Sequence, residues 1–156
     1  MSRQEPLEAA AVWLAQACAD FDAAAVITEL APHVACFQAQ QAAEKATQAL
    51  YVAQGVDFRF THSVFDLVAT AQDVFPTLER FKDQAATLDD YYVGTRYPLA
   101  GLLATTPPSS RYSPQLAAGA VEMARGILEE CQRLYGELVP KDAQSGQPDP
   151  QKPGAS

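Results

Sequence analysis

Two stretches of this chain carry side chains whose types and spacing could do chemistry. In "ACFQAQQAAEKATQALYVAQG" (35–55), polar side chains recur at spacings of three, four and three, namely Gln38, Gln41, Lys45 and Gln48. That spacing places them on one face of an α-helix. In "DDYYVGTRYP" (89–98), three tyrosines surround Arg96. Tyrosine rings can stack on a base and an arginine can bind a phosphate, so the second stretch is typical of a nucleotide site.

Each stretch also has a purely structural interpretation. Glutamine and lysine are good helix formers, so the polar face of residues 35–55 can be a solvated surface. In the second stretch, Tyr91 and Tyr92 can pack in the core or in an interface, and Arg96 can pair with Asp89 or Asp90. The sequence leaves both interpretations open.

Other chemistries have little support in the chain. It has two histidines; Glu29 and His33 are four apart, whereas the helical dimetal sites use a Glu and a His three apart, and His62 has no carboxylate three residues before it. We therefore expect no metal site and no cofactor. No G-x-S-x-G, Walker or G-x-G-x-x-G motif occurs. The three cysteines lie in apolar helical patterns, which predicts buried, reduced thiols: Cys18, Cys36 and Cys131.

Periodic apolar residues predict the elements that must position these side chains. Helices are expected over residues 6–20, 32–54, 77–92 and 114–138, with a short helix that begins at Ser63 and is capped with the help of Asp66. Alanines at spacings of four and three form a seam that lets a neighbouring helix approach closely: Ala35, Ala39, Ala42, Ala46, Ala49 and Ala53. The pattern predicts an all-α fold, an antiparallel up-and-down four-helix bundle with one additional short helix.

Composition predicts the domain organisation and the surroundings of the protein. The bundle should occupy residues 1–139, and residues 140–156, with four prolines and two glycines, should form a disordered tail. A net charge of −8 argues against a broad basic face for nucleic acid, although it permits a local anion site. No signal peptide is evident, and no apolar run approaches the ~20 residues that cross a bilayer. We therefore expect a soluble, cytoplasmic protein with no membrane contact.

Four blocks occur along the chain in the order "QAQQAAEKATQAL", "THSVFDLV", "LDDYYVGTRYP" and "AAGAVEMARGILEEC". Taken together, they resemble the HEPN family (higher eukaryote and prokaryote nucleotide-binding domain), and the resemblance covers about residues 6 to 136. It implies an up-and-down helical bundle that forms homodimers and binds a nucleotide such as ATP, or RNA. It also implies a minimal nucleotidyltransferase as partner, in pairs that can act as toxin and antitoxin.

The resemblance stops short of the motif that makes some HEPN members metal-independent ribonucleases. Those members carry an arginine, four to six intervening residues, and then a histidine. After Arg96 these positions hold Gly101, Leu102 and Leu103, and after Arg111 they hold three further apolar residues, Leu116, Ala117 and Ala118. We therefore expect a binding protein with no catalytic residues from this motif. Two alternatives stay open: a ribonuclease toxin that uses His33 or His62, and a plain helical interaction module.

The expected nucleotide site centres on Arg96, which would bind a phosphate, with Tyr97 as a stacking surface. Neutral hydrogen bonds and a further charge would come from the polar helix face, namely from Gln38, Gln41 and Lys45. In an up-and-down bundle, Arg96 should lie nearer His33 and Phe37 than Lys45, which is ~18 Å further along the helix axis. Lys45 would then join Arg96 only across a dimer, or would serve a separate purpose.

Overall fold

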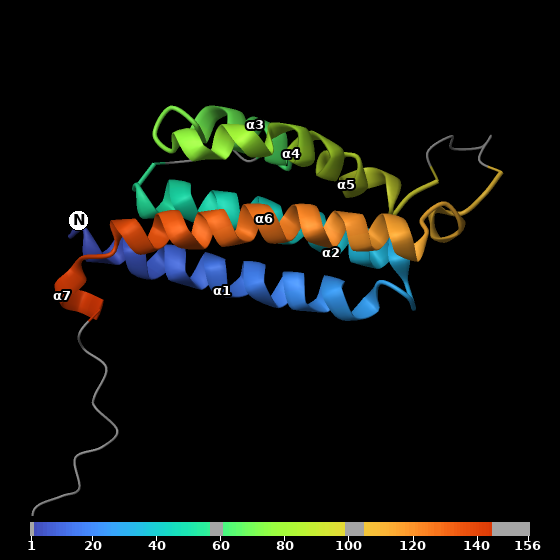
Figure 1. Ribbon diagram of the computed structural model, residues 1–156, viewed down its shortest axis with the longest axis horizontal. Helices are drawn as coiled ribbons and strands as arrows, with labels where there is room; N and C mark the ends of the chain where they lie inside the picture. The colour runs from blue at the N-terminus through green and yellow to red at the C-terminus, as the bar shows by residue number, and fades with distance from the viewer. Residues whose placement is uncertain (1, 57–60, 99–104, 145–156) are drawn as a thin grey trace, which may run out of the picture.

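Three long helices and a layer of shorter ones make up the bundle in the computed structural model, which describes residues 2–56, 61–98 and 105–144. The long helices α1 (Gln4–Ile27), α2 (Pro32–Ala53) and α6 (Pro114–Leu138) lie side by side (Figure 1). The second layer contains α3 (Val64–Ala71), the 3₁₀ helix η1 (Pro76–Phe81), α4 (Lys82–Asp89) and α5 (Tyr91–Gly94). The described residues also form two short helices, η3 (Pro108–Ser110) and α7 (Lys141–Gln144). The described residues include no strand, and the all-α, up-and-down bundle is confirmed.

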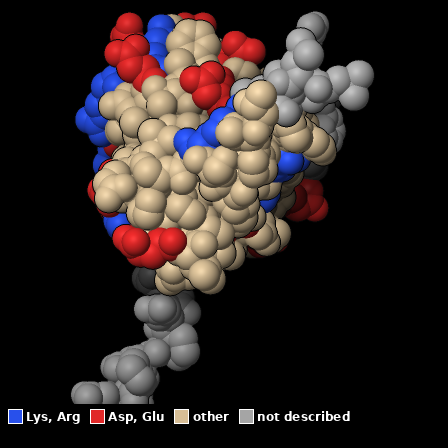
Figure 2. Space-filling model, turned by 90° about the vertical axis from the view of Figure 1, so that its right-hand side faces the viewer, with Lys and Arg blue, Asp and Glu red and all other residues tan. Residues whose placement is uncertain are grey.

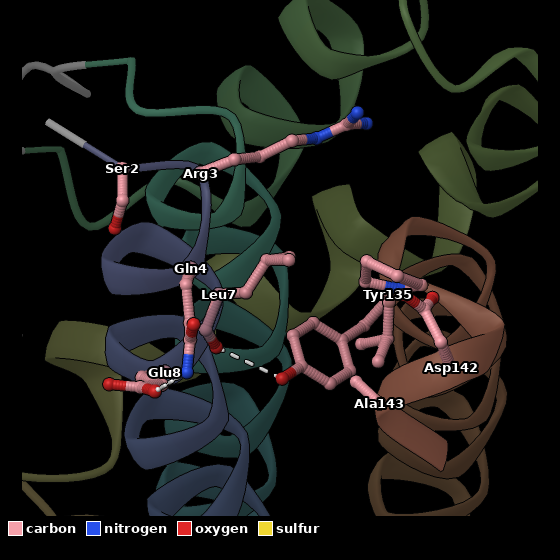
Figure 3. Close-up of a pocket in the computed structure, with 10 residues that line it drawn as sticks. Ser2, Arg3, Gln4, Leu7, Glu8, Tyr135, Asp142 and Ala143 are labelled. Carbon is pink, nitrogen blue, oxygen red and sulfur yellow. Dashed lines mark hydrogen bonds between the residues drawn. The ribbon is translucent and has the colours of Figure 1, made fainter. Parts of the chain in front are cut away.

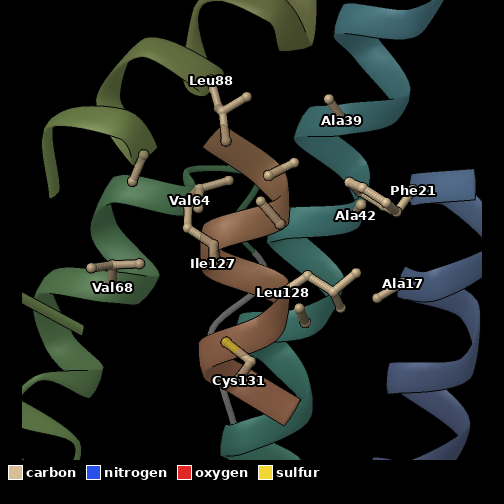
Figure 4. Close-up of a cluster of buried hydrophobic side chains, with 14 of the residues drawn as sticks. Ala17, Phe21, Ala39, Ala42, Val64, Val68, Leu88, Ile127, Leu128 and Cys131 are labelled. Atoms are coloured by element: carbon tan, nitrogen blue, oxygen red, sulfur yellow. The ribbon is translucent and has the colours of Figure 1, made fainter. Parts of the chain in front are cut away.

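The alanine seam of α2 lies at the centre of the core. Five of its six alanines are fully buried: Ala35, Ala39, Ala42, Ala46 and Ala49. α2 packs against α1 through small and aromatic side chains such as Ala17 and Phe21, and against α6 through branched ones such as Ile127 and Leu128 (Figure 4). Because alanine adds little bulk, both neighbours can lie close to the α2 backbone.

The sequence predicts the bounds of α2 and α6 well and those of α1 poorly. α2 ends one residue before the expected 54, and Gly55 follows with φ +65°, the left-handed conformation that ends many helices. α1 was expected to end at Asp20 and instead continues to Ile27, because neither glycine nor proline interrupts the chain before Pro32.

The predicted helix over residues 77–92 is wrong as a single element. Pro76 opens the 3₁₀ helix η1, and α4 begins only after Phe81, whose backbone leaves the helical region at φ −100°, ψ 4°. The Phe81 ring lies against Gly126 of α6, where a Cβ atom would come within 3.0 Å of the ring. One consequence matters for the site: Tyr91 is buried in the core, whereas Tyr92, which the pattern assigns to the core, is only partly buried.

Two expectations about the ends of the chain need correction. The first residues of the predicted tail are ordered as α7, and residues 145–156 lie outside the described part. By length and composition α1 could cross a membrane, contrary to the expectation that no segment qualifies. This is weak evidence, because a core helix passes the same test, and one face of α1 is buried in this bundle.

The cysteines provide a direct check of the core. Burial raises the pKa of the Cys36 thiol to about 11 and that of Cys131 to about 12, and the thiolate is the reactive form. Cys18 is only partly buried and accepts a hydrogen bond from Gln132 Nε2. We expect a disulfide reagent at pH 8 to label Cys18 quickly and the other two only after unfolding in urea. Rapid labelling of two or three thiols in the native protein would contradict this packing.

Candidate phosphate-binding site

The polar face of α2 is divided between two neighbours and is not a uniformly solvated surface. Lys45 points toward α1 and forms a salt bridge with the buried Asp20. Gln40, Glu44 and Gln48 are buried, with exposed fractions of 0%, 5% and 5%. Gln40 and Glu44 contact His62, in the segment that leads into α3, and Gln48 bonds to Glu44.

Glu44 is the centre of this buried polar cluster. Its Oε2 accepts hydrogen bonds from Gln40 Nε2 (2.9 Å) and Gln41 Nε2 (3.1 Å), and its Oε1 accepts one from Gln48 Nε2 (3.2 Å). The fourth partner is His62, whose Nδ1 lies 3.1 Å from Oε1. Within the described ranges, no lysine or arginine pairs with Glu44, so His62 is the ionisable group that faces this carboxylate.

The backbone around His62 is fixed from two sides. Gln40 Nε2 donates to the His62 carbonyl at 3.0 Å. Immediately after it, Ser63 caps α3 as predicted, because its hydroxyl accepts from the Asp66 N–H. The carboxylate of Asp89, at the end of α4, accepts from the Ser63 hydroxyl and from two backbone N–H groups of the first turn, those of Val64 and Phe65. Burial raises the pKa of Asp89, and these three hydrogen bonds oppose that rise.

Aromatic rings connect His62 to Arg96. The imidazole of His62 stacks on Tyr92, with ring centres 4.4 Å apart and planes at 16°. The guanidinium Cζ of Arg96 lies 4.5 Å from the centres of both Phe37 and Tyr92, and 5.4 Å from that of Tyr97. Arg96 Nε donates to the Tyr92 carbonyl at 2.7 Å, which leaves its terminal nitrogens for other partners. Cation–π contacts to three rings hold this side chain in place.

A cavity of about 250 Å³ adjoins the Arg96 guanidinium. It is lined by His33, Val34, Phe37, Thr95 and Arg96. The Nδ1 atom of His33 is buried and has no hydrogen-bond partner in the described part of the chain. Figure 2 shows the end of the bundle at which α2 and α6 begin: uncharged side chains cover most of it, a few basic groups lie near its middle, and acidic groups lie mainly toward its edges. A small anionic group therefore has both space and positive charge at this end.

Arg96 carries an uncompensated positive charge. Among residues 2–56, 61–98 and 105–144, no carboxylate lies within ion-pair distance of it. The structural interpretation that pairs Arg96 with Asp89 or Asp90 is therefore wrong. Asp89 is used to cap α3, and Asp90 is exposed. Arg111 has a structural position, since its Nη2 lies 3.4 Å from the Gly94 carbonyl at the end of α5.

The predicted site residues are brought together only in part. Arg96 and Tyr97 are adjacent and exposed, and Arg96 lies by His33 and Phe37 as the bundle order predicts. Gln41 bonds to Gln40 and Glu44 inside the buried cluster. Of the two remaining residues, Lys45 pairs with Asp20 of α1, away from Arg96, and Gln38 is partly buried on α2.

Sequence reasoning did not assign Glu44 to this site. It placed Phe37 near Arg96, counted Tyr92 among the tyrosines around Arg96, and named His62 only for the ribonuclease alternative. The signal for Glu44 in the sequence is the helical spacing of Phe37, Gln41, Glu44 and Gln48, which puts one aromatic ring in line with the polar residues. His62 lies in a connecting segment, where periodicity gives no information about its neighbours.

A larger cavity, about 520 Å³, lies at the other end of the bundle, where α7 meets the start of α1 (Figure 3). Its polar groups are largely satisfied within the chain: Gln4 donates to Glu8, and the Tyr135 hydroxyl donates to the Leu7 carbonyl. The smaller cavity beside Arg96 is therefore the better candidate, because its charge and its buried His33 nitrogen have no such partners among the described residues.

Comparisons with known proteins agree with this fold. The HEPN domain pattern matches residues 10–134, and the chain belongs to the HEPN domain family. It is similar to the crystal structure of TT1696 from Thermus thermophilus, with a TM-score of 0.72 and 34% identity over 80% of this chain and 96% of the other. It is also similar to ST0689, an archaeal HEPN homologue, with a TM-score of 0.66 and 27% identity over 81% and 97% of the two chains. The comparison with curated proteins found no match.

The Asp89 cap provides a test of how the site is positioned. Asp89→Ala removes the acceptor of three hydrogen bonds at the start of α3, and we expect it to lower the free energy of unfolding by about 2 kcal/mol. Asp90→Ala makes the same change one residue later, at an exposed side chain, and should cost less than about 0.5 kcal/mol. Urea unfolding followed by circular dichroism measures both. Equal losses for the two variants would show that Asp89 does not hold α3.

Proposed function

We propose that the protein binds the phosphate of a nucleotide or of RNA at Arg96. The observation that carries this proposal is the Arg96 guanidinium itself, held over three aromatic rings, beside a cavity, with no carboxylate partner in the described ranges. An arginine whose position is fixed before binding loses little side-chain entropy when a phosphate arrives. Membership of the HEPN family supports the same function.

The surroundings of Arg96 suit a nucleotide better than a bare anion. Tyr97 is 58% exposed and adjacent to the guanidinium, so its ring is available to stack on a base. The overall charge of −8 repels extended polyanions, and binding should therefore depend on a few local contacts rather than on a broad basic surface. Lys45, already neutralised by Asp20, contributes little in this arrangement.

Removal of Arg96 should weaken nucleotide binding strongly. A charge-assisted contact to phosphate contributes roughly 1.5–3 kcal/mol, so Arg96→Ala should raise the Kd for ATP about ten- to a hundredfold. Calorimetric titration of ATP measures the change, and circular dichroism checks that the variant is folded.

Arg125→Ala is the matched control for that titration. Arg125 also lies over an aromatic ring, 4.8 Å from the centre of Phe21, but it is paired with Glu122 on the same helix. Both variants remove one positive charge, and only Arg96→Ala should lose affinity. If the two bind ATP equally well, Arg96 is not the phosphate ligand. If the parent binds neither ATP nor RNA, the interaction-module alternative replaces this proposal.

We further propose that the protein works as a homodimer. Three partly buried aromatic residues are engaged within the chain and do not form its contact surface: Tyr51 and Tyr135 donate to backbone carbonyls, and Trp13 packs against the core. Among the described large apolar residues, the three most exposed lie on and beside the outer face of α1: Val12, Val26 and Leu30 are 70%, 84% and 86% exposed.

Spacing along that face favours a second copy as its occupant. The exposed residues Val12, Ala15, Ala19, Ala23 and Val26 are symmetric about Ala19. Two antiparallel α1 helices crossing at Ala19 would therefore bring Ala15 against the partner's Ala23, and Val12 against the partner's Val26, as a two-fold interface requires. Small residues at the crossing allow close approach.

A charge placed at the crossing should separate the copies. Light scattering at micromolar concentration should give twice the 16.8 kDa monomer mass for the parent and the monomer mass for Ala19→Glu, because two glutamates would meet on the symmetry axis. Ala86→Glu, on the exposed side of α4, is the control and should stay dimeric. A monomeric parent would exclude the homodimer, and a dimeric Ala19→Glu would exclude this face.

A minimal nucleotidyltransferase is the partner that we propose for the dimer, as in toxin–antitoxin pairs of the family. The support is family membership alone. Co-purification with the product of a neighbouring nucleotidyltransferase reading frame would test it, and the absence of such a reading frame would remove its support.

A further inference from the structure

The buried polar cluster of α2 holds one exposed histidine in a fixed orientation. Gln40 binds the backbone carbonyl of His62, Glu44 binds its Nδ1, and one face of its ring stacks on Tyr92. Even so, 51% of the His62 side chain is exposed. The opposite edge of the imidazole, which carries Nε2, has no hydrogen-bond partner within the described ranges. The fold therefore presents this edge to solvent in one orientation.

The contact with Glu44 determines what Nε2 offers to a ligand. The carboxylate oxygens accept hydrogen bonds from glutamine N–H groups, and by the same role they place the proton of the 3.1 Å contact on His62 Nδ1. Nε2 then accepts a hydrogen bond when the ring is neutral and donates one when the ring is charged. A hydroxyl group both donates and accepts, so it satisfies either form, whereas a C–H group satisfies neither.

His62 and Arg96 lie along one aromatic surface. The His62 ring centre is 4.4 Å from the centre of Tyr92, and the Arg96 Cζ atom is 4.5 Å from the same centre. The two groups are therefore separated by no more than the sum of these distances. In a nucleotide, one sugar ring separates the 5′-phosphate from the 2′-hydroxyl, and a ribose can bridge a separation of this size. A phosphate bound at Arg96 thus brings its own sugar within reach of His62.

We propose that His62, oriented by Glu44, binds the 2′-hydroxyl of the nucleotide whose phosphate is bound at Arg96, so that the site selects ribonucleotides over 2′-deoxyribonucleotides. This inference rests on the proposed phosphate binding. Neither the guanidinium of Arg96 nor the ring of Tyr97 can make this distinction, because the phosphates and the stacking face of the base are the same in both kinds of nucleotide. The 2′-hydroxyl is the group in which ATP and dATP differ.

The other histidine near Arg96 is less suited to this role. His33 lines the cavity beside the guanidinium, but its Nδ1 is buried, with neither a carboxylate nor any other partner in the described part of the chain. No contact there fixes which ring nitrogen holds the proton. His33 therefore provides a matched control for His62.

The first experiment needs no variant, because the change is made in the ligand. Calorimetric titration of the parent with ATP and with dATP should give a Kd about three- to tenfold lower for ATP, as expected for one hydrogen bond to a neutral group. The ratio of the two Kd values is the quantity that reports on the 2′-hydroxyl, since contacts to phosphate and base cancel in it.

His62→Phe assigns the preference to its residue. Phenylalanine keeps a flat ring beside Tyr92 and removes both ring nitrogens, so the ratio should fall to about one while the Kd for dATP stays within about twofold of the parent value. His33→Phe should keep the ratio of the parent. Circular dichroism checks folding. If His62→Phe leaves the Glu44 carboxylate too poorly bonded to fold, the double variant with Glu44→Gln removes that buried charge and gives the same comparison.

Glu44 acts through His62 and is tested as a positioning residue. Glu44→Gln puts an amide opposite Nδ1, and an amide can donate or accept, so the proton of the imidazole is no longer fixed on one nitrogen. The ratio should fall below about twofold with the Kd for dATP unchanged. A purely structural role of Glu44 would change the Kd of both nucleotides together and leave the ratio as it is in the parent.

The outcomes separate this inference from the proposed function. A parent that binds ATP and dATP equally well overturns the inference and leaves phosphate binding at Arg96 intact. A preference for ATP that persists in folded His62→Phe also overturns it, because another group must then contact the 2′-hydroxyl. A parent that binds neither nucleotide overturns both proposals.

Discussion

The close approach of α1 and α6 to the alanine seam of α2 is the constraint from which the rest of the structure follows. Five fully buried alanines let both long helices lie against one side of α2. The shorter helices α3 to α5 then cover what remains, so α2 has little surface left for water. Polar side chains on its second face cannot be solvated and must satisfy one another.

That requirement explains how a surface-like sequence becomes a buried network. Glutamine is long enough to turn its amide toward a neighbour one helical turn away, and Gln40 and Gln48 both reach Glu44 across four residues. Each amide that donates to the carboxylate removes part of its desolvation cost. Because three of the four partners are neutral and lie on α2 itself, most of the hydrogen bonds that position Glu44 come from its own helix.

The periodic spacing of apolar residues predicted the helices, whereas contacts between residues far apart in the sequence determine the site. The apolar stripes of α2 and α6 and the Ser63 cap were readable from spacing alone, and the up-and-down order placed Arg96 near His33 and Phe37. The contact of Glu44 with His62 joins residues 18 apart in sequence across a connecting segment, where periodicity says nothing. Asp89 shows the same limit of sequence reasoning. It lies seven residues before Arg96 and could have been its ion-pair partner. In the structure, its position at the end of α4 turns it toward the N–H groups of α3. Asp89 accepts three hydrogen bonds at the start of α3 and does not pair with Arg96. The distance between two residues in the sequence cannot reveal such a choice of partner.

The Asp89 carboxylate also joins α4 to α3 by hydrogen bonds, so these helices of the second layer are connected as one unit. Arg96 follows α5 at one end of that unit, and His62 precedes α3 within it. Between these two ends lies the Tyr92 ring, which stacks on His62 and lies 4.5 Å from the Arg96 guanidinium. The position of His62 therefore depends on α2, through Gln40 and Glu44, and on the second layer, through Asp89 and Tyr92.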